Sequence, residues 1–304
     1  MASLEQINYQ PHRAEISDSS LQWTPLKRKP IRNLPQIVWE DNSTWAEANL
    51  WALDQATSSK RDLKTVRSNM SHLLAYAKWL EAESIQWWHF PERESERCLV
   101  RFRGALVAAR NNGDIAPSTA SQRMAAVIRF YKWTQSRRLI SPEWPMWEQR
   151  FVGIKLTNPF GLEHTMRVAS TDLAIPNRKV AGAIQLEDGL LPVTVSAMKE
   201  ILALADRSAT EELSLMLRIG FFTGLRIGSI TDLKVQTLHN ATIVPEVGWK
   251  RLAVGPGARP MVSTKFGVSG SVPIPDELLE TLIAYSMSTR RLKRQMLASP
   301  EDRD

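Results

Sequence analysis

The residue whose type and surroundings most directly suggest chemistry is Arg226. It follows a Thr-Gly-Leu turn within residues 222–231 (FTGLRIGSIT), and apolar residues lie on both sides of it. Burying a guanidinium group is costly unless an anion pairs with it. We therefore expect Arg226 to pair either with a carboxylate, in a structural salt bridge, or with a phosphate. The motif alone leaves both partners open.

Basic residues recur along two predicted helices. They are Lys60, Lys64 and Arg67 on one helix and Arg123, Arg129 and Lys132 on the other. Such residues are usually a solvated helix face, but two stripes in one small bundle also fit a surface that grips DNA. The net charge of +7 favours a polyanionic partner, although a basic protein without one would show the same charge.

Composition excludes several other classes of function. The chain has 43% hydrophobic and 23% charged residues, which is typical of a soluble globular protein. We find no apolar run near the roughly 18 residues that span a bilayer, and no secretory signal. A single cysteine, Cys98, fits a reducing cytoplasm. The five histidines are scattered, so we expect no metal site.

The elements that must position these residues divide the chain into four parts. We expect an extended basic arm over residues 1–42, with little core of its own, where Lys27–Lys29 could follow DNA or be a solvated tail. Apolar residues spaced by three and four predict an all-α bundle of about four helices over residues 43–142. Residues 143–190 are rich in Pro and Gly and form a connector. Residues 191–304 predict helices around a small antiparallel sheet.

The order of these features resembles the tyrosine recombinases, the phage integrase family. The bundle, with its Pro117-Ser-Thr helix start, resembles the SAM-like core-binding domain of that family. Residues 223–227 (TGLRI) match the motif that carries the first catalytic arginine. Residues 264–267 (TKFG), followed by 272–275 (VPIP), resemble the β-hairpin that carries the catalytic lysine. The implied fold is mainly α, with a mixed α+β catalytic domain that lacks its C-terminal part.

The resemblance also implies a mechanism and partners. Arg226 would stabilise charge on the non-bridging oxygens of the scissile phosphate, and Lys265 would protonate the departing 5′-oxygen. No metal or nucleotide cofactor is needed, because a phosphotyrosyl bond conserves the bond energy. The implied partners are double-stranded DNA and further protomers in a tetrameric synapse, and the implied role is integration or excision of a mobile genetic element. The alternative for Lys265 is an exposed hairpin lysine without a catalytic role.

This sequence departs from the family pattern in two places. Ser229 stands where an acidic residue usually orients the arginine, and Asp232 is the nearest carboxylate. No histidine follows Lys265, so the H-x-x-R segment and the nucleophilic tyrosine of the family are not where we expect them. His164-Thr-Met-Arg167 has the H-x-x-R letters but precedes Arg226, and we interpret it as a coincidence. Tyr285, the one tyrosine after the hairpin, is expected to pack in the core.

Three interpretations follow from the sequence. The first is an integrase of the tyrosine-recombinase type, and the second is an inactive DNA-binding remnant that regulates an intact recombinase. The third is a helical scaffold in which Arg226 forms an ordinary salt bridge. Covalent trapping on nicked DNA separates the first two, and the stability of an Arg226→Ala variant separates the third.

Overall fold

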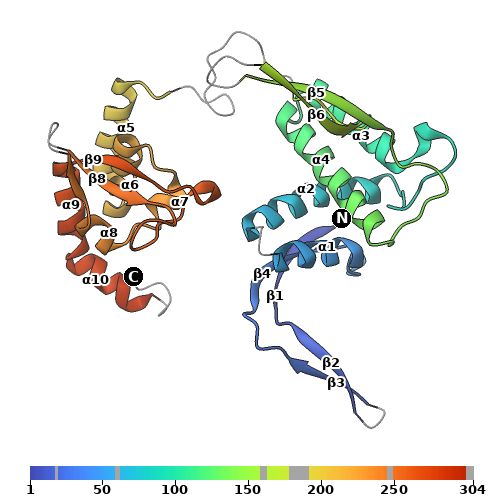
Figure 1. Ribbon diagram of the computed structural model, residues 1–304, viewed down its shortest axis with the longest axis horizontal. Coiled ribbons are helices and arrows are strands. Elements are labelled where there is room, and N and C mark those ends of the chain that lie inside the picture. The colour runs from blue at the N-terminus through green and yellow to red at the C-terminus, as the bar shows by residue number, and fades with distance from the viewer. Residues whose placement is uncertain (18–19, 59–61, 158–162, 178–191, 245–248, 299–304) are drawn as a thin grey trace. The chain divides into compact units, whose positions relative to one another are not determined.

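The chain divides into two compact units. The computed structural model describes residues 1–17, 20–58, 62–157, 163–177, 192–244 and 249–298 (Figure 1). Unit 1 comprises Met1–Ala181 and unit 2 comprises Gly182–Asp304. This division lies within the stretch that the sequence predicts as a connector. Each unit is described below by itself.

Four helices form the centre of unit 1. They are α1 (Ala46–Thr57), α2 (Leu63–Ala82), α3 (Cys98–Asn111) and α4 (Pro117–Ser136). Asp62 caps α2 by accepting a hydrogen bond from the backbone N–H of Lys64, and Pro117 begins α4, where a missing N–H costs nothing. On α2 the apolar residues Val66, Met70 and Leu73 are fully buried, as their helical spacing requires.

An aromatic cluster joins these helices. The rings of Trp45 and Phe130 meet edge to face with centroids 5.2 Å apart, and the hydroxyls of Tyr76 and Tyr131 lie 2.8 Å apart. Cys98 is buried beside Tyr131, and this burial raises the pKa of its thiol. The cluster fixes α2 against α4 in the interior of the unit.

The prediction of a mainly α fold is wrong, because strands precede and follow the helices of unit 1. Strand β1 (Ser3–Tyr9) pairs with β4 (Ile31–Val38), and β2 (His12–Ser17) pairs with β3 (Ser20–Pro25). Helices account for about 49% and strands for about 21% of the structure, so the chain is a mixed α/β protein. Nothing in the described part of the chain supports a SAM-like bundle.

The first 42 residues are therefore not an arm without a core. Leu34 and Ile37 of β4 are buried, and the side chain of Asn49 on α1 bonds both the N–H and the C=O of Ile37. Figure 1 shows the β2–β3 hairpin continuing away from the helices of unit 1. Pro35 lies within β4 opposite Gln6, in a sheet of only two strands, where each strand has an open edge that tolerates proline.

A second hairpin occupies part of the predicted connector. Strand β5 (Gln149–Thr157) pairs with β6 (Glu163–Thr171) in a two-stranded antiparallel sheet. Phe151, Val152 and Met166 on this hairpin are exposed, so no buried face imposes an alternating pattern on the sequence. The residues that follow return to the core of unit 1, where Leu173 and Ile175 are buried.

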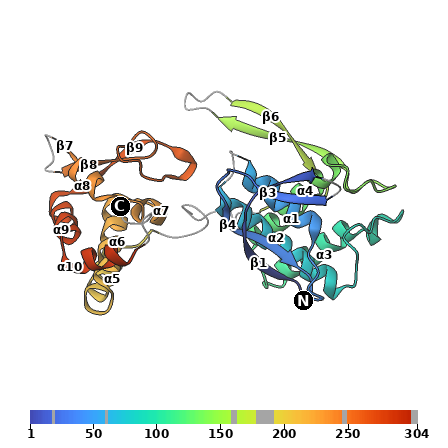
Figure 2. The ribbon, with the colours of Figure 1, turned by 90° about the horizontal axis from the view of Figure 1, so that it is seen from below.

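Unit 2 is a smaller α/β unit. Its helices are α5 (Val195–Ser208), α6 (Glu211–Thr223), α7 (Ile227–Ile230), α8 (Val235–His239), α9 (Asp276–Ser286) and α10 (Thr289–Leu297). Its sheet has the antiparallel order β7 (Thr242–Val244), β8 (Trp249–Val254), β9 (Gly270–Pro275). Figure 2 shows this sheet on one side of helices α5, α6 and α10. Leu252 and Ile274 of the sheet meet Leu279 of α9 in the core.

None of the helices in the described ranges is both long and apolar enough to cross a lipid bilayer.

Candidate phosphate-binding site and basic face

The turn that carries Arg226 is fixed by the end of α6. Gly224 adopts φ +67°, a left-handed conformation that suits glycine, and its N–H donates to the carbonyl of Gly220. The Thr223 hydroxyl accepts from the N–H of Leu225 at 3.2 Å. The carbonyl of Arg226 then accepts from the N–H groups of Ser229 and Ile230, so Arg226 begins α7 as its N-cap residue.

The expectation that Arg226 is set among apolar residues and needs an anion for that reason is wrong. Its side chain is exposed, as is that of its neighbour Ile227. Burial therefore does not dictate a structural salt bridge at this position. An exposed guanidinium at the start of a helix is also accessible to an external anion.

Ser263 joins this turn to the segment that carries Lys265. The buried Ser229 donates its hydroxyl to the carbonyl of Ser263 at 2.7 Å, and the N–H of Ser263 donates to the carboxylate of Asp232 at 2.6 Å. Asp232 also pairs with Lys234 at 3.3 Å. Burial alone would raise the pKa of Asp232, but the bonds from Ser263 and the ion pair with Lys234 outweigh it, so the net pKa is lowered. We call this arrangement the Ser263 clamp.

Lys265 follows the clamp by two residues, in a single 3-10 turn over Lys265–Gly267. The Thr264 hydroxyl donates to the carbonyl of Val268 at 2.7 Å and closes this loop. The end of β8 approaches closely: a side chain at Gly255, which has φ +94°, would collide with the backbone of Val268. These contacts close the loop, and Lys265 is exposed on it.

The clamp thus ties together the two segments that carry Arg226 and Lys265. Arg226 lies three residues before Ser229, and Lys265 lies two residues after Ser263. Two exposed cations on bonded segments can hold a phosphate, with the planar arginine donating paired hydrogen bonds and the lysine acting as a point charge or proton donor. Sequence reasoning found both cations but missed the clamp.

Tyr285 does not offer a ready nucleophile. It packs against the core of unit 2, and its hydroxyl donates to Glu212 at 2.8 Å. Glu212 also accepts from Arg290 at 2.8 Å and from Arg294 at 3.2 Å. Burial and the hydrogen bond to Glu212 raise the pKa of Tyr285 to about 12. The hydrogen bond from Arg290 on α10 holds the pKa of Glu212 well below its usual range.

The H-x-x-R tetrapeptide lies in unit 1, on β6. The guanidinium of Arg167 stacks over the ring of Phe151 on β5, 4.0 Å from its centroid. This contact within the hairpin occupies Arg167 in a structural role. The side chain of His164 lies outside the described residues.

The two helices that carry the predicted basic stripes, α2 and α4, pack against each other. We define the basic face by Lys64, Arg67, Arg123, Arg129 and Lys132. His72 on α2 lies near two of these arginines. Its pKa is lowered mainly by burial and also by the charges of Arg123 and Arg129. Lys64, Arg67, Arg129 and Lys132 are exposed. Lys60, the remaining predicted DNA-binding residue, lies outside the described residues.

A chain of buried amides orients one member of the basic face. Asn69 donates to the Gln55 side chain at 2.8 Å and accepts from the Arg129 guanidinium at 2.9 Å. Both amides are buried, so leaving either unpaired would be unfavourable. These two hydrogen bonds link α1, α2 and α4. The sequence offers no signal for it beyond two amides on apolar helices.

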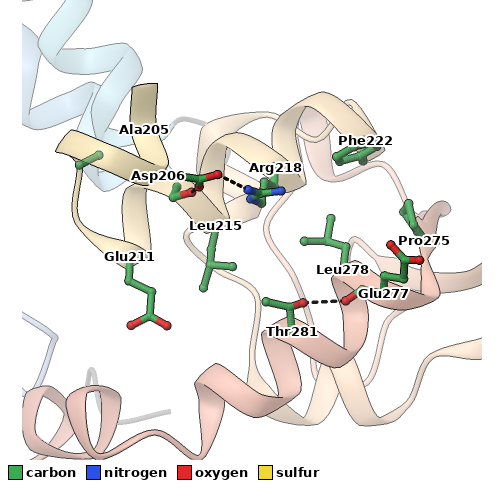
Figure 3. A pocket seen from close by; sticks show the side chains of 12 residues that line it. Ala205, Asp206, Glu211, Leu215, Arg218, Phe222, Pro275, Glu277, Leu278 and Thr281 are labelled. Atoms are coloured by element: carbon green, nitrogen blue, oxygen red, sulfur yellow. Dashed lines mark hydrogen bonds and ion pairs between the residues drawn. The ribbon is translucent and has the colours of Figure 1, made fainter. Parts of the chain in front are cut away.

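Unit 2 also contains a pocket that neither proposed phosphate-binding residue lines. It is lined by residues of α5, α6 and α9 together with Pro275, and Figure 3 shows Arg218 within it. Asp206 accepts from Arg218 at 2.6 Å and from Ser214 at 2.5 Å. Neither Arg226 nor Lys265 lines it. Among the described residues there is no group of three metal-ligating side chains that could hold an ion.

Comparison with family models, with curated proteins and with solved structures finds no match to this chain.

Proposed function

We propose that the chain binds duplex DNA and holds a backbone phosphate between Arg226 and Lys265, in the manner of a tyrosine recombinase. The observation that carries this proposal is the Ser263 clamp, which bonds the two cation-bearing segments to one residue. Arg123 and Arg129 of unit 1 supply the second support, because the charges of both reach His72 and a polyanion would neutralise them.

The chemistry of such a site follows from the two side chains. As an attacking hydroxyl releases its proton to solvent and forms its bond to phosphorus, negative charge grows on the non-bridging oxygens, and Arg226 donates hydrogen bonds to them. The bond to the 5′-oxygen breaks with its electron pair on oxygen, and Lys265 supplies the proton. Tyr285 is already engaged with Glu212, so we assign the attacking tyrosine to a recombinase partner in a tetrameric synapse on cytoplasmic DNA.

The test is binding of a fluorescent duplex by the full chain, measured by anisotropy, with covalent trapping on a nicked duplex. Arg226→Ala and Lys265→Ala should each weaken binding while the melting temperature changes little. Arg251→Ala, which removes an exposed cation from β8, is the matched control. If the wild-type chain does not bind duplex DNA, the proposal fails. If Arg226→Ala unfolds unit 2, Arg226 is structural instead.

A second candidate function is a DNA-binding protein without cleavage activity, which regulates an intact recombinase by occupying its sites. The engagement of Tyr285 by Glu212 favours it. Adding an intact recombinase to the trapping reaction separates the two. An adduct that increases with wild-type chain but not with Lys265→Ala supports phosphate positioning, and an adduct that decreases with both supports regulation by occupancy.

A further inference from the structure

Phe266 has the largest exposed fraction among the large hydrophobic residues in the described parts of the chain. Its exposed fraction is 90%, and it follows Lys265 at the tip of the loop that the Ser263 clamp holds. A fully solvated phenyl ring contributes nothing to the core of unit 2. Its position at the proposed phosphate site calls for a different explanation.

The backbone at Phe266 is also unfavourable for an aromatic residue. Phe266 has φ +65°, the left-handed region in which glycine and asparagine are favoured. It is the third residue of a turn closed by a bond from the N–H of Gly267 to the carbonyl of Thr264. Four other described residues that are not glycine share a positive φ, and all are polar: Asn33, Asn42, Ser84 and Arg138. Backbone strain of this kind concentrates at functional sites.

Phe266 lies beside a cation and a second exposed apolar residue. The ammonium group of Lys265 lies 5.4 Å from the centroid of its ring. Val268, two residues on, is 62% exposed, so the tip is apolar beside a cation. The bond from the N–H of Gly257 to the Ser269 hydroxyl, at 2.9 Å, ties the loop to the end of β8. An exposed apolar tip next to a cation can enter a DNA groove beside a contacted phosphate.

We propose that Phe266 is a DNA wedge, which enters a groove and stacks on a base next to the phosphate that Lys265 contacts. The ring would partly unstack one base step, as apolar side chains of groove-binding proteins do. Its contribution carries no charge and is therefore independent of salt. This inference rests on the proposed function, because it takes the phosphate bound by Lys265 as its reference point.

The test uses the full chain and a random-sequence duplex with 2-aminopurine in place of adenine in one strand. Phe266→Gly and Phe266→Asn both suit the left-handed backbone, so they should fold at least as well as the wild type. Each should lose roughly tenfold in affinity and most of the 2-aminopurine fluorescence increase that unstacking produces. Phe266→Trp should retain both. The slope of log affinity against log salt should stay unchanged for Phe266→Gly, whereas Lys265→Gln should reduce it by about one.

Ile243→Ala, which removes another exposed apolar side chain from β7, is the matched control and should leave binding unchanged. Equal affinity and fluorescence for wild type and Phe266→Gly would overturn the wedge while leaving the proposed function intact. Absence of duplex binding by the wild type would overturn both. Loss of self-association on Phe266→Gly, with DNA binding unaffected, would instead assign the residue to a contact between copies of the chain.

Discussion

Single side chains decide the geometry of the candidate site, and Ser229 shows how. It stands where the resembled family has an acidic residue, yet it is buried and its hydroxyl reaches the carbonyl of Ser263. The carboxylate of Asp232, three residues after Ser229, accepts a hydrogen bond from the N–H of Ser263. A serine and an aspartate together thus fix the neighbouring segment through its backbone. The identity of the residue at 263 matters less than its position.

Ser229→Ala should test this role. Losing the hydroxyl should destabilise the protein by about 1 kcal/mol, because one buried hydrogen bond is removed. It should also weaken duplex binding, since the Lys265 segment is less firmly held. Thr231→Ala removes a hydroxyl that bonds only within its own turn and serves as the control. Unfolding by urea and DNA anisotropy are the measurements, and equal binding by both variants would contradict the clamp.

His72 predicts a pH dependence at the basic face. Burial and the charges of Arg123 and Arg129 lower its pKa, so the fold of the free protein favours the neutral ring. A bound phosphate partly neutralises those arginines and raises the pKa of His72 again. The bound state then takes up a proton, and affinity should increase as pH falls from about 7.5 to about 5.5. Stability of the free protein should change in the opposite direction, because protonation is disfavoured in its fold.

The measurement is duplex anisotropy across that pH range. His72→Gln should reduce the pH dependence, whereas His89→Gln, at an exposed histidine, should preserve it. An unchanged pH profile in His72→Gln would show that the phosphates do not approach α2 and α4 at this point.

At the scale of elements, the end of β8 supports the lysine loop. Gly255 permits the close approach, because any Cβ there would meet the carbonyl of Val268. Gly255→Ala should therefore cost more than about 1 kcal/mol through both the positive φ and the collision. It should also displace the loop and reduce DNA binding. Gly270→Ala in β9, where a Cβ meets nothing, should change thermal stability and binding much less.

The elements that sequence reasoning found are those with a buried face. The helix at residues 63–82 was predictable from Val66, Met70 and Leu73, because one side of it packs in the core. Strands β2 and β3 gave no such signal: Trp23 and Leu21 are exposed, and the hairpin buries neither face fully. In β4 a proline interrupts the pattern. The strands of unit 1 were thus missed for lack of burial, and the fold class was wrong as a result.

The site was partly predictable for a related reason. The Thr-Gly-Leu-Arg turn is local, so the position of Arg226 at a helix start follows from a few adjacent residues. The clamp joins residues that lie 31 and 34 positions apart in the sequence. No short-range pattern encodes such a pairing. The exposure of Arg226 was also not predictable, because apolar neighbours in the sequence need not surround a residue in space.

At the scale of the whole molecule, charge predicts how DNA binding responds to salt. A variant with glutamine at Lys64, Arg67 and Lys132 should reduce the slope of log affinity against log salt by about one for each phosphate that the protein no longer neutralises. Its affinity at physiological salt should fall steeply. Titrations of a duplex at several salt concentrations measure both quantities.

The control removes the same net charge from another part of unit 1. It carries glutamine at Arg93, Arg101 and Arg110, in and just before α3. Two of these arginines form exposed ion pairs, which contribute little to stability. If this variant reduces the salt dependence as much as the first, DNA binding reflects overall charge rather than the basic face.

The burial of Cys98 makes the protein convenient for spectroscopy. A single cysteine with a raised pKa and no access to solvent resists maleimide reagents while the protein stays folded. Asp114→Cys in unit 1 and Glu280→Cys in unit 2 introduce exposed thiols that accept a donor and an acceptor dye. Energy transfer between the two dyes, measured with and without duplex, reports whether DNA changes the distance between them. Single-molecule traces would then time any such change directly, on the native cysteine background.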